Sequence, residues 1–366
     1  MRDRDRLRLI RTRGIGPVTY RQLIARFGDA TRALAALPDL ARRGGGTAPR
    51  PPEPRTIERE LQRVADLGAR HLFIDDSAYP PLLAELESAP PAIIVRGDIA
   101  LAHRPVVAIV GARNASAAAC RFARQIAHDL ADAGTAVVSG LARGIDTAAH
   151  MGAGRQTIAV IAGGIDMAYP PENDALQQRI GDEALLIAEM PPGTEPRARH
   201  FPHRNRIIAG IAAGTLVVEA APRSGSLITA RLANEAGREV MAVPGSPLDP
   251  RAQGCNLLIR DGATLVQSAA DVLEQIRPID PRVIRAPAMR FDPPPPADAD
   301  DAARRAIVTL LGPVPVAVDE LIRQSGYAPA IVQIVLLELE LAGRLERHAG
   351  GRVSLTLLPS SLSPLP

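Results

Sequence analysis

Residues 106–116 read VVAIVGARNAS, and this stretch decides the fold. Five consecutive apolar residues, most of them β-branched, end at a glycine that polar residues follow. A short apolar run of this kind is typical of a strand buried on both faces, and such strands belong to parallel sheets covered by helices on both sides. Six similar runs follow, separated by helical patterns: AVVSG (136–140), TIAVIA (157–162), ALLIAE (184–189), TLVVEA (215–220), EVMAVPG (239–245) and TLVQS (264–268). The pattern predicts an α/β fold with a doubly wound, mainly parallel, Rossmann-like sheet.

Ligands of such sheets bind in the crevice beyond the carboxyl ends of the strands, so the loops after the runs carry the candidate site. The first loop, GARNAS (111–116), has Gly111 for a tight turn, Arg113 as a cation and Ser116 at the start of the next helix. Backbone N–H groups at a helix start attract anions, which makes this loop a candidate phosphate cradle. The G-x-G-x-x-G spacing of dinucleotide-binding proteins is absent, so the sequence does not support an NAD site.

The next two loops continue the same pattern of glycine and arginine. SGLARGID (139–146) carries Arg143, and GGIDMAYP (163–170) carries Gly163, Gly164 and the aromatic Tyr169. Asp146 lies four residues before His150 on a predicted helix, but no further ligands for a metal are assembled around this pair. We therefore expect Asp146 and His150 to serve capping and packing, and we predict no metal site.

A concentrated basic stretch, RARHFPHRNR (197–206), follows the fourth run. Phe201, Arg204, Asn205 and Arg206 open a predicted helix there, and guanidinium groups beside a helix start suit a phosphodiester. The alternative is a solvated basic face. After the fifth run, Ser224, Gly225 and Ser226 predict backbone amides that bind an anion, although helix capping alone explains the two serines equally well.

Composition removes several functional classes. The chain has 366 residues, and all 43 of its basic residues other than histidine are arginine, so a catalytic lysine or a P-loop lysine is excluded. Two cysteines are too few for a disulfide framework or a cysteine-based zinc site. No segment reaches the length of a membrane span, and the charged start MRDRDRLRLIRTR is unlike a signal peptide, so we expect a cytoplasmic protein. We predict no catalytic residues and no cofactor.

Glycine- and proline-rich seams divide the chain. GGGTAPRPPEP (44–54) follows a helix, GIGP turn and helix pattern, and residues 276–301 are rich in proline. We predict four parts: a helical N-terminal domain, SAM-like or helix-hairpin-helix-like, at 1–68; the Rossmann-like domain at 69–275; a linker at 276–303; and a winged-helix domain at 304–357. The first part carries 15 arginines and eight acidic residues, a net charge of +7, whereas 69–275 carries 18 and 22, a net charge of −4.

The winged-helix domain is indicated by three helical patterns followed by a hairpin with two glycines. Its third helical pattern, from Ala328 to Ala342, contains no arginine and two glutamates. Apolar residues occupy nearly every face of that pattern. We therefore favour a protein-interaction or packing role for this helix over contact with DNA.

Seven ordered motifs between residues 70 and 270 resemble the DprA/Smf family of bacterial DNA-processing proteins: GAR, SGLARGID, GGIDMAYPPEN, FPHRNRIIAG, VVEA with SGSLITA, AVPG and GCNLLIRDGA. The flanking domains resemble those of the family's longer members. The resemblance implies binding of single-stranded DNA, loading of the RecA recombinase in natural transformation and recombination, and a homodimer formed through the Rossmann-like domain.

With no lysine anywhere, every phosphate contact that relatives make through lysine falls to arginine or is lost. The alternative is a nucleotide-processing enzyme similar to phosphoribohydrolases, which have a PGGxGTxxE motif. This chain has VVEAAPRSGSLITA instead, and Glu219 is the lone carboxylate that such an activity would use.

Overall fold

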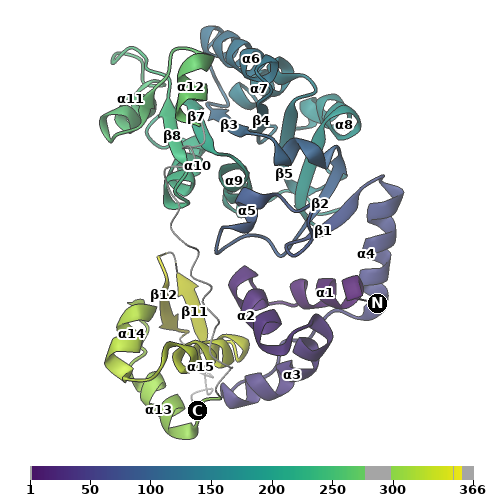
Figure 1. Cartoon of the computed structure of the whole chain (residues 1–366), viewed down its shortest axis with the longest axis vertical. Coiled ribbons are helices and arrows are strands. Elements are labelled where there is room, and N and C mark those ends of the chain that lie inside the picture. The colour runs from purple at the N-terminus through teal and green to yellow at the C-terminus, as the bar shows by residue number, and fades with distance from the viewer. Residues whose placement is uncertain (1, 277–297, 349, 357–366) are drawn as a thin grey trace, which may run out of the picture. The chain divides into compact units, whose positions relative to one another are not determined.

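The computed structural model describes residues 2–276, 298–348 and 350–356 (Figure 1). Contacts divide the chain into two compact units. The α/β unit is Arg59–Arg285, and the terminal unit combines Met1–Glu58 with Ala286–Pro366. None of the helices within the described ranges is long and apolar enough to cross a membrane.

The α/β unit contains a nine-stranded sheet in the order β1-β2-β6-β5-β4-β3-β7-β8-β9. Strands β3 to β9 are parallel to their neighbours within this group and coincide with the seven apolar runs, which confirms the predicted doubly wound sheet. The first two strands are antiparallel additions at one edge that the sequence analysis did not anticipate. The strands are β1 (Arg70–Phe73), β2 (Ala92–Gly97), β3 (Val106–Gly111), β4 (Ala136–Ser139), β5 (Thr157–Gly164), β6 (Leu185–Met190), β7 (Gly214–Val218), β8 (Glu239–Ala242) and β9 (Thr264–Leu265).

Helices cover both faces of this sheet, so its central strands are fully buried (Figure 1). One core cluster joins the sheet to α6, α7 and α12, and the other joins it to α8, α9 and α10. The unit's helices are α5 (Pro81–Ala84), α6 (Ala117–Asp132), α7 (Ile145–Ala153), α8 (Asp174–Glu183), α9 (His200–Ile211), α10 (Gly225–Glu235), α11 (Gln253–Arg260), α12 (Ala269–Gln275) and the short 3-10 segments η1 (Ile99–His103) and η2 (Pro171–Asn173). The longer α4 (Pro54–Asp66) crosses the boundary between the two units.

The chain changes direction across the sheet at β3. This strand pairs with β4 on one side, from which the sheet continues to β5 and β6, and with β7 on the other side, from which it continues to β8. The loops after β3 and β7 therefore leave adjacent strand ends in opposite directions. Such a topological switch point opens the crevice in which doubly wound proteins bind their ligands.

The terminal unit holds two small folds from opposite ends of the sequence, and both match the predicted types. The N-terminal helices are α1 (Arg2–Ile10), α2 (Pro17–Phe27) and α3 (Ala30–Arg43). The winged-helix domain comprises α13 (Asp301–Thr309), β10 (Val316–Ala317), α14 (Val318–Ser325), α15 (Pro329–Leu341), β11 (Leu345–His348) and β12 (Arg352–Leu355). Residues 277–297, most of the predicted linker, lie outside the described residues.

We expect Ile109→Ala to destabilise the α/β unit by about 2–5 kcal/mol, because Ile109 is fully buried in the central strand β3 and its loss leaves a cavity. Leu248→Ala, at a residue 90% exposed in the same unit, should change the free energy of unfolding by less than about 0.5 kcal/mol. Urea unfolding followed by circular dichroism measures both. Equal effects of the two changes would contradict the assignment of β3 to the core.

Candidate functional site

A cleft of about 940 Å³ lies at the switch point of the sheet. Its walls come from the loop after β3, the loop after β7 and the start of α9. A smaller hollow of about 300 Å³ shares Arg113, Phe201 and Arg204 with the cleft and adds Arg143 and Gly140. Loops separated by about a hundred residues in the sequence thus line one continuous depression.

Phe201 stands at the centre of a cationic and aromatic group in this cleft. The guanidinium carbon of Arg113 lies 5.2 Å from the centroid of the Phe201 ring, and that of Arg204 lies 5.9 Å from it. The Tyr169 ring is 5.6 Å from the Phe201 ring, inclined by 60°. Tyr169 is 47% exposed, so the group offers an accessible aromatic face beside positive charge. Sequence reasoning named all four of these residues, and the structure brings them together.

Arg204 is the buried cation of the cleft, only 6% exposed. Burial lowers its pKa to about 10, while the charge of Asp146 opposes that shift, so the guanidinium remains charged at neutral pH. Its Nε atom is buried without a hydrogen-bond partner among the described residues. Gly140 makes room for this group, because a Cβ atom there would lie 1.3 Å from Nη1 of Arg204. An unsatisfied buried donor in a polar cleft is suited to an anionic ligand.

Asp146 and His150 both hold the loop after β4 through its backbone. Asp146 accepts hydrogen bonds from the N–H groups of Gly140 (3.2 Å) and Ala142 (3.3 Å), and burial raises its pKa against the opposing charge of Arg204. His150 Nε2 accepts from the Leu141 N–H at 3.3 Å, and its Nδ1 lies 2.7 Å from the Thr157 hydroxyl. Burial lowers the pKa of His150 to about 3, so it is neutral. Over the described ranges of the chain, no group of three or more His, Cys, Asp or Glu residues could hold a metal ion.

Ser116 caps α6, and Glu219 occupies the same helix start. The Ser116 backbone N–H donates to Glu219 Oε2 at 2.8 Å, and its hydroxyl donates to Oε1 at 2.5 Å. Glu219 adopts a left-handed backbone conformation, with φ of 47°, which is uncommon for a residue other than glycine. The predicted phosphate cradle at Ser116 therefore already contains a carboxylate from this chain. The same bonds engage both oxygens of the carboxylate that the nucleotide-processing alternative would use.

Two predicted arginines have carboxylate partners of their own. Arg143 pairs with Glu172 on the surface, and Arg206 donates to Glu189 at 2.6 Å. The Arg206 side chain is 12% exposed and does not line either hollow, although its neighbour Asn205 lines the larger one. Sequence position alone could not reveal these pairings, because Glu172 and Glu189 come from other segments of the chain.

The predicted glycines bring backbone segments close together. A Cβ atom at Gly163 would lie 2.8 Å from the Thr194 carbonyl oxygen, and one at Gly164 would lie 2.6 Å from that of Pro191. A Cβ atom at Gly111 would lie 1.9 Å from the Val218 carbonyl oxygen in the adjacent strand. Gly163 and Gly164 thus seat the loop that leads into the basic stretch, while Gly111 brings the ends of β3 and β7 together.

The start of α10 forms the far wall of the cleft. Ser224 caps this helix by accepting from the Ser226 N–H at 3.3 Å, and the two hydroxyl oxygens are 2.7 Å apart. Gly225 lines the cleft between them. Arg223 and Arg251 also line it, and sequence reasoning did not select either one. Arg223 directly precedes the selected serines, so its place in the loop after β7 was the available signal.

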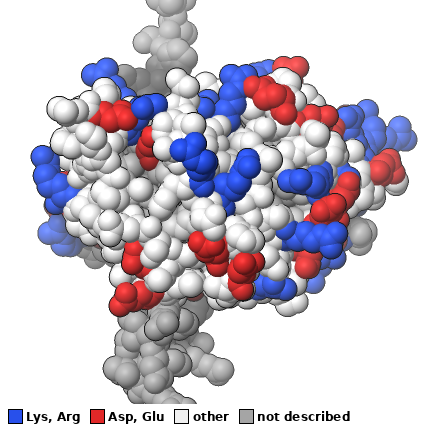
Figure 2. All heavy atoms as spheres, turned by 90° about the horizontal axis from the view of Figure 1, so that it is seen from above, with Lys and Arg blue, Asp and Glu red and all other residues white. Residues whose placement is uncertain are grey.

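Surface charge is mixed on one end of the molecule. In Figure 2, which shows the end of the molecule that is uppermost in Figure 1, blue basic and red acidic side chains are interspersed rather than gathered into one field. A broad basic surface is therefore absent from that face of the described residues.

The fold and the cleft together define a doubly wound α/β protein with a cationic, aromatic depression at its switch point, flanked in sequence by a helical domain and a winged helix. Three family descriptions match the same three parts: DNA recombination-mediator protein A at residues 70–277, DprA-like N-terminal HHH domain at 2–62 and DprA winged helix domain at 291–351. The chain belongs to the DprA/Smf family of DNA recombination mediators.

Relatives align with most of the chain. Protein Smf of Synechocystis is 33% identical over 93% of this chain and 95% of its own, and DNA processing protein DprA of Streptococcus pneumoniae is 47% identical over 60% of this chain and 77% of its own. The X-ray structure of the pneumococcal protein covers 61% of this chain and 78% of that one, with a TM-score of 0.58 and 43% identity. A Helicobacter pylori DNA processing protein A, whose structure is described for its single-stranded DNA binding mode, has a TM-score of 0.52 and 26% identity, and covers 56% of this chain and 94% of that one.

Two glycines test how the loop after β4 is seated. Gly144 and Gly154 share nearly the same backbone conformation (φ 74°, ψ −119° and φ 56°, ψ −115°), but a Cβ atom at Gly144 would lie 2.3 Å from the Ala112 carbonyl oxygen, whereas Gly154 has open space. We expect Gly154→Ala to cost about 1–3 kcal/mol for backbone strain alone. Gly144→Ala should cost at least about 1 kcal/mol more, because it adds a backbone clash. Thermal unfolding compares the stability of the two variants. Equal losses would mean that the loop after β4, with Gly144, is not in contact with the loop after β3, with Ala112.

Proposed function

We propose that this protein binds single-stranded DNA in the cleft at the switch point of its α/β unit and delivers that DNA to the RecA recombinase. The observation that carries the proposal is the group of Phe201 and Tyr169 with Arg113 and Arg204. Bases of single-stranded DNA expose faces that stack on aromatic rings, whereas bases in a duplex stack on one another. Guanidinium groups beside the rings suit the phosphates between those bases.

The residues divide by role under this proposal. Arg113 and Arg204 meet phosphates, with Arg143, Arg223 and Asn205 extending the track along the cleft. Tyr169 and Phe201 stack with bases. Gly225 offers its backbone amide, while Ser224 and Ser226 hold the start of α10, because their own N–H groups donate within the loop. Gly111, Gly163, Gly164 and Ser116 act as positioning residues, because their contacts are made with the protein's own chain. Arg206 positions α9 through Glu189.

The wider role rests on family membership and on the relative from Helicobacter pylori. We propose a binding protein rather than an enzyme, active as a homodimer formed through the α/β unit and located in the cytoplasm. The domain limits that we propose remain 1–68 and 69–275, and we move the end of the linker from 303 to a point before Asp301, because α13 of the winged-helix domain begins there. Since the chain has no lysine, arginine makes every cationic contact to phosphate.

We expect Arg113→Ala to weaken binding of a labelled single-stranded oligonucleotide by a similar factor for all base sequences, because phosphate contacts carry no base information. Fluorescence anisotropy measures this. Arg155→Ala is the matched control, since Arg155 is 79% exposed, lies in the same unit and lines neither hollow. With about four phosphates neutralised, log K should fall with log salt at a slope of about −3. A slope near zero, or equal losses in both variants, would contradict the proposed track.

Two substitutions of Phe201 distinguish a role in stacking with bases from a role in packing of the protein. Phe201→Ala should weaken single-strand binding by about 1–3 kcal/mol, the range for loss of one base–aromatic stack. Phe201→Leu keeps much of the apolar volume but has no aromatic face, so we expect a similar loss of affinity together with a smaller loss of thermal stability. If Phe201→Leu binds like the unchanged protein, the ring only fills space and the stacking role is wrong.

Delivery to the recombinase is tested separately. We expect the protein to speed assembly of RecA filaments on oligonucleotides coated with single-strand binding protein, measured by fluorescence of a labelled strand. Arg113→Ala should lose this acceleration in proportion to its loss of DNA affinity. An unchanged protein that binds single strands but gives no acceleration would overturn the delivery step and leave DNA binding standing.

A further inference from the structure

The third helix of the winged-helix domain, α15, has almost no free surface. Eight of its 13 residues are buried, including residues on opposite sides of the helix. Its own domain covers part of this surface through α13, α14 and β11, and the N-terminal helix α3 packs along another part. The apolar side chains on nearly every face of this helix are thus covered by other helices and strands of the terminal unit.

Two glycines after α3 let the backbones meet. A Cβ atom at Gly44 would lie 2.0 Å from the Glu338 carbonyl oxygen, and one at Gly46 would lie 2.2 Å from that of Ala342. Gly44 has φ of −72°, a backbone conformation open to any residue. A glycine is required at this position because the backbone of α15 lies so close to it. Arg344 adds a hydrogen bond from Nη1 to the Gly44 carbonyl oxygen at 3.0 Å.

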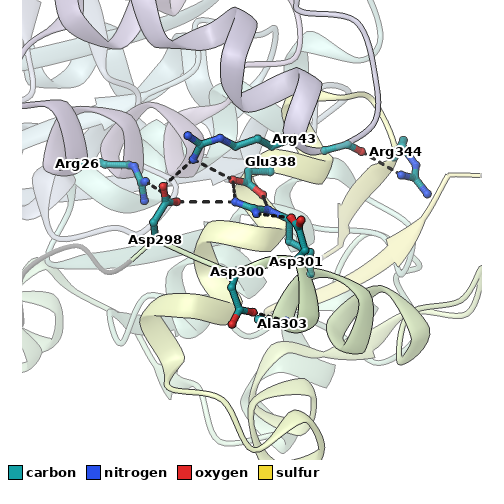
Figure 3. A network of polar contacts seen from close by, with 10 residues as sticks. Arg26, Arg43, Asp298, Asp300, Asp301, Ala303, Glu338 and Arg344 are labelled. Carbon is teal, nitrogen blue, oxygen red and sulfur yellow. Dashed lines mark hydrogen bonds and ion pairs between the residues drawn. The ribbon is translucent and has the colours of Figure 1, made fainter.

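A network of charges crosses the same contact (Figure 3). Glu338 on α15 is 1% exposed and accepts two bonds from Arg304 of its own domain, at 2.8 and 3.0 Å. Arg43 of the N-terminal domain lies 3.9 Å from Glu338 and 2.7 Å from Asp298, which also accepts from Arg26 at 3.1 Å. Glu338, the buried charge of this network, therefore has an arginine from each domain beside it, which compensates the cost of burying a carboxylate.

The remaining polar side chains of α15 also face the N-terminal domain. Gln333 accepts from Gln22 at 3.0 Å, and Glu340 accepts from the Thr19 hydroxyl at 2.8 Å. With Glu338, these are all the polar side chains of the helix, whose sequence is PAIVQIVLLELEL. A helix that reads duplex DNA presents donors to phosphates and bases, whereas this one presents two carboxylates and an amide that are already bonded.

We infer that the third helix of the winged-helix domain is a protein-docking surface whose occupant is the chain's own N-terminal domain, and that this helix does not read duplex DNA. The inference goes beyond the proposed cleft function and does not depend on it. The two ends of the chain act as one module, connected to the α/β unit by two separate segments.

Cleavage of the full-length protein between its α/β unit and its winged-helix domain tests whether the winged-helix domain stays bound to the N-terminal domain. A protease site inserted between residues 285 and 286 allows complete cleavage, after which the C-terminal fragment should co-elute with the rest of the protein in size-exclusion chromatography at micromolar concentration. Gly46→Val should weaken this association about tenfold or more, because the added side chain meets the Ala342 backbone. Gly312→Val is the matched control, since Gly312 has open space around it.

A second variant approaches the contact from the other side. Ala342→Leu should release the fragment as well, because the Ala342 Cβ lies 2.8 Å from the point that a Cβ atom would occupy at Gly44 and 2.7 Å from the corresponding point at Gly46. Circular dichroism of the separated parts shows whether each still folds. The inference fails if the unchanged fragment elutes alone, if both variants stay bound, or if saturating duplex DNA displaces the fragment while binding it.

Discussion

A buried positive charge is the constraint around which the cleft is built. Arg204 loses most of its water when α9 packs against the strand ends, and a guanidinium in that position is stable only with compensation. Asp146 supplies an opposite charge, Phe201 supplies a π-face, and Gly140 leaves the space that the group fills. The segment after β4, which carries Gly140 and Asp146, and the start of α9 must therefore be in place together before the cation can be accommodated. The same arrangement leaves one donor unsatisfied, and an anion would complete it.

Much of the fold could be predicted because its strands are apolar on both faces. Runs such as VVAIV and TIAVIA can only be buried strands in a chain whose intervening segments are helical. The antiparallel strands β1 and β2 escaped notice because segments of four and six residues give little periodic signal, and β2 directly follows Pro90 and Pro91. The third N-terminal helix, α3, contains Pro38 and lies next to a glycine-rich seam, which obscured it.

The candidate site was predictable in its residue types but not in their pairings. Positions after buried strands point to the crevice by topology alone, which is why Arg113, Arg143 and Ser224 could be selected. Whether a side chain is available depends on partners elsewhere in the chain. Glu219 lies 103 positions from Ser116, the residue that it engages at the start of α6. Glu189 lies 17 positions from Arg206. Spacing in one sequence carries no information about such contacts.

The terminal unit has a consequence for the order in which the chain becomes structured during synthesis. Its N-terminal helices leave the ribosome first, yet 286 positions separate Arg43, the last residue of α3, from Pro329, the first residue of α15. At about 5–20 residues per second, the face of α3 that contacts α15 waits roughly 14–57 seconds for its partner. The entire α/β unit emerges within that interval and can fold around its local strand and helix pairs. The terminal unit is thus begun first and completed last.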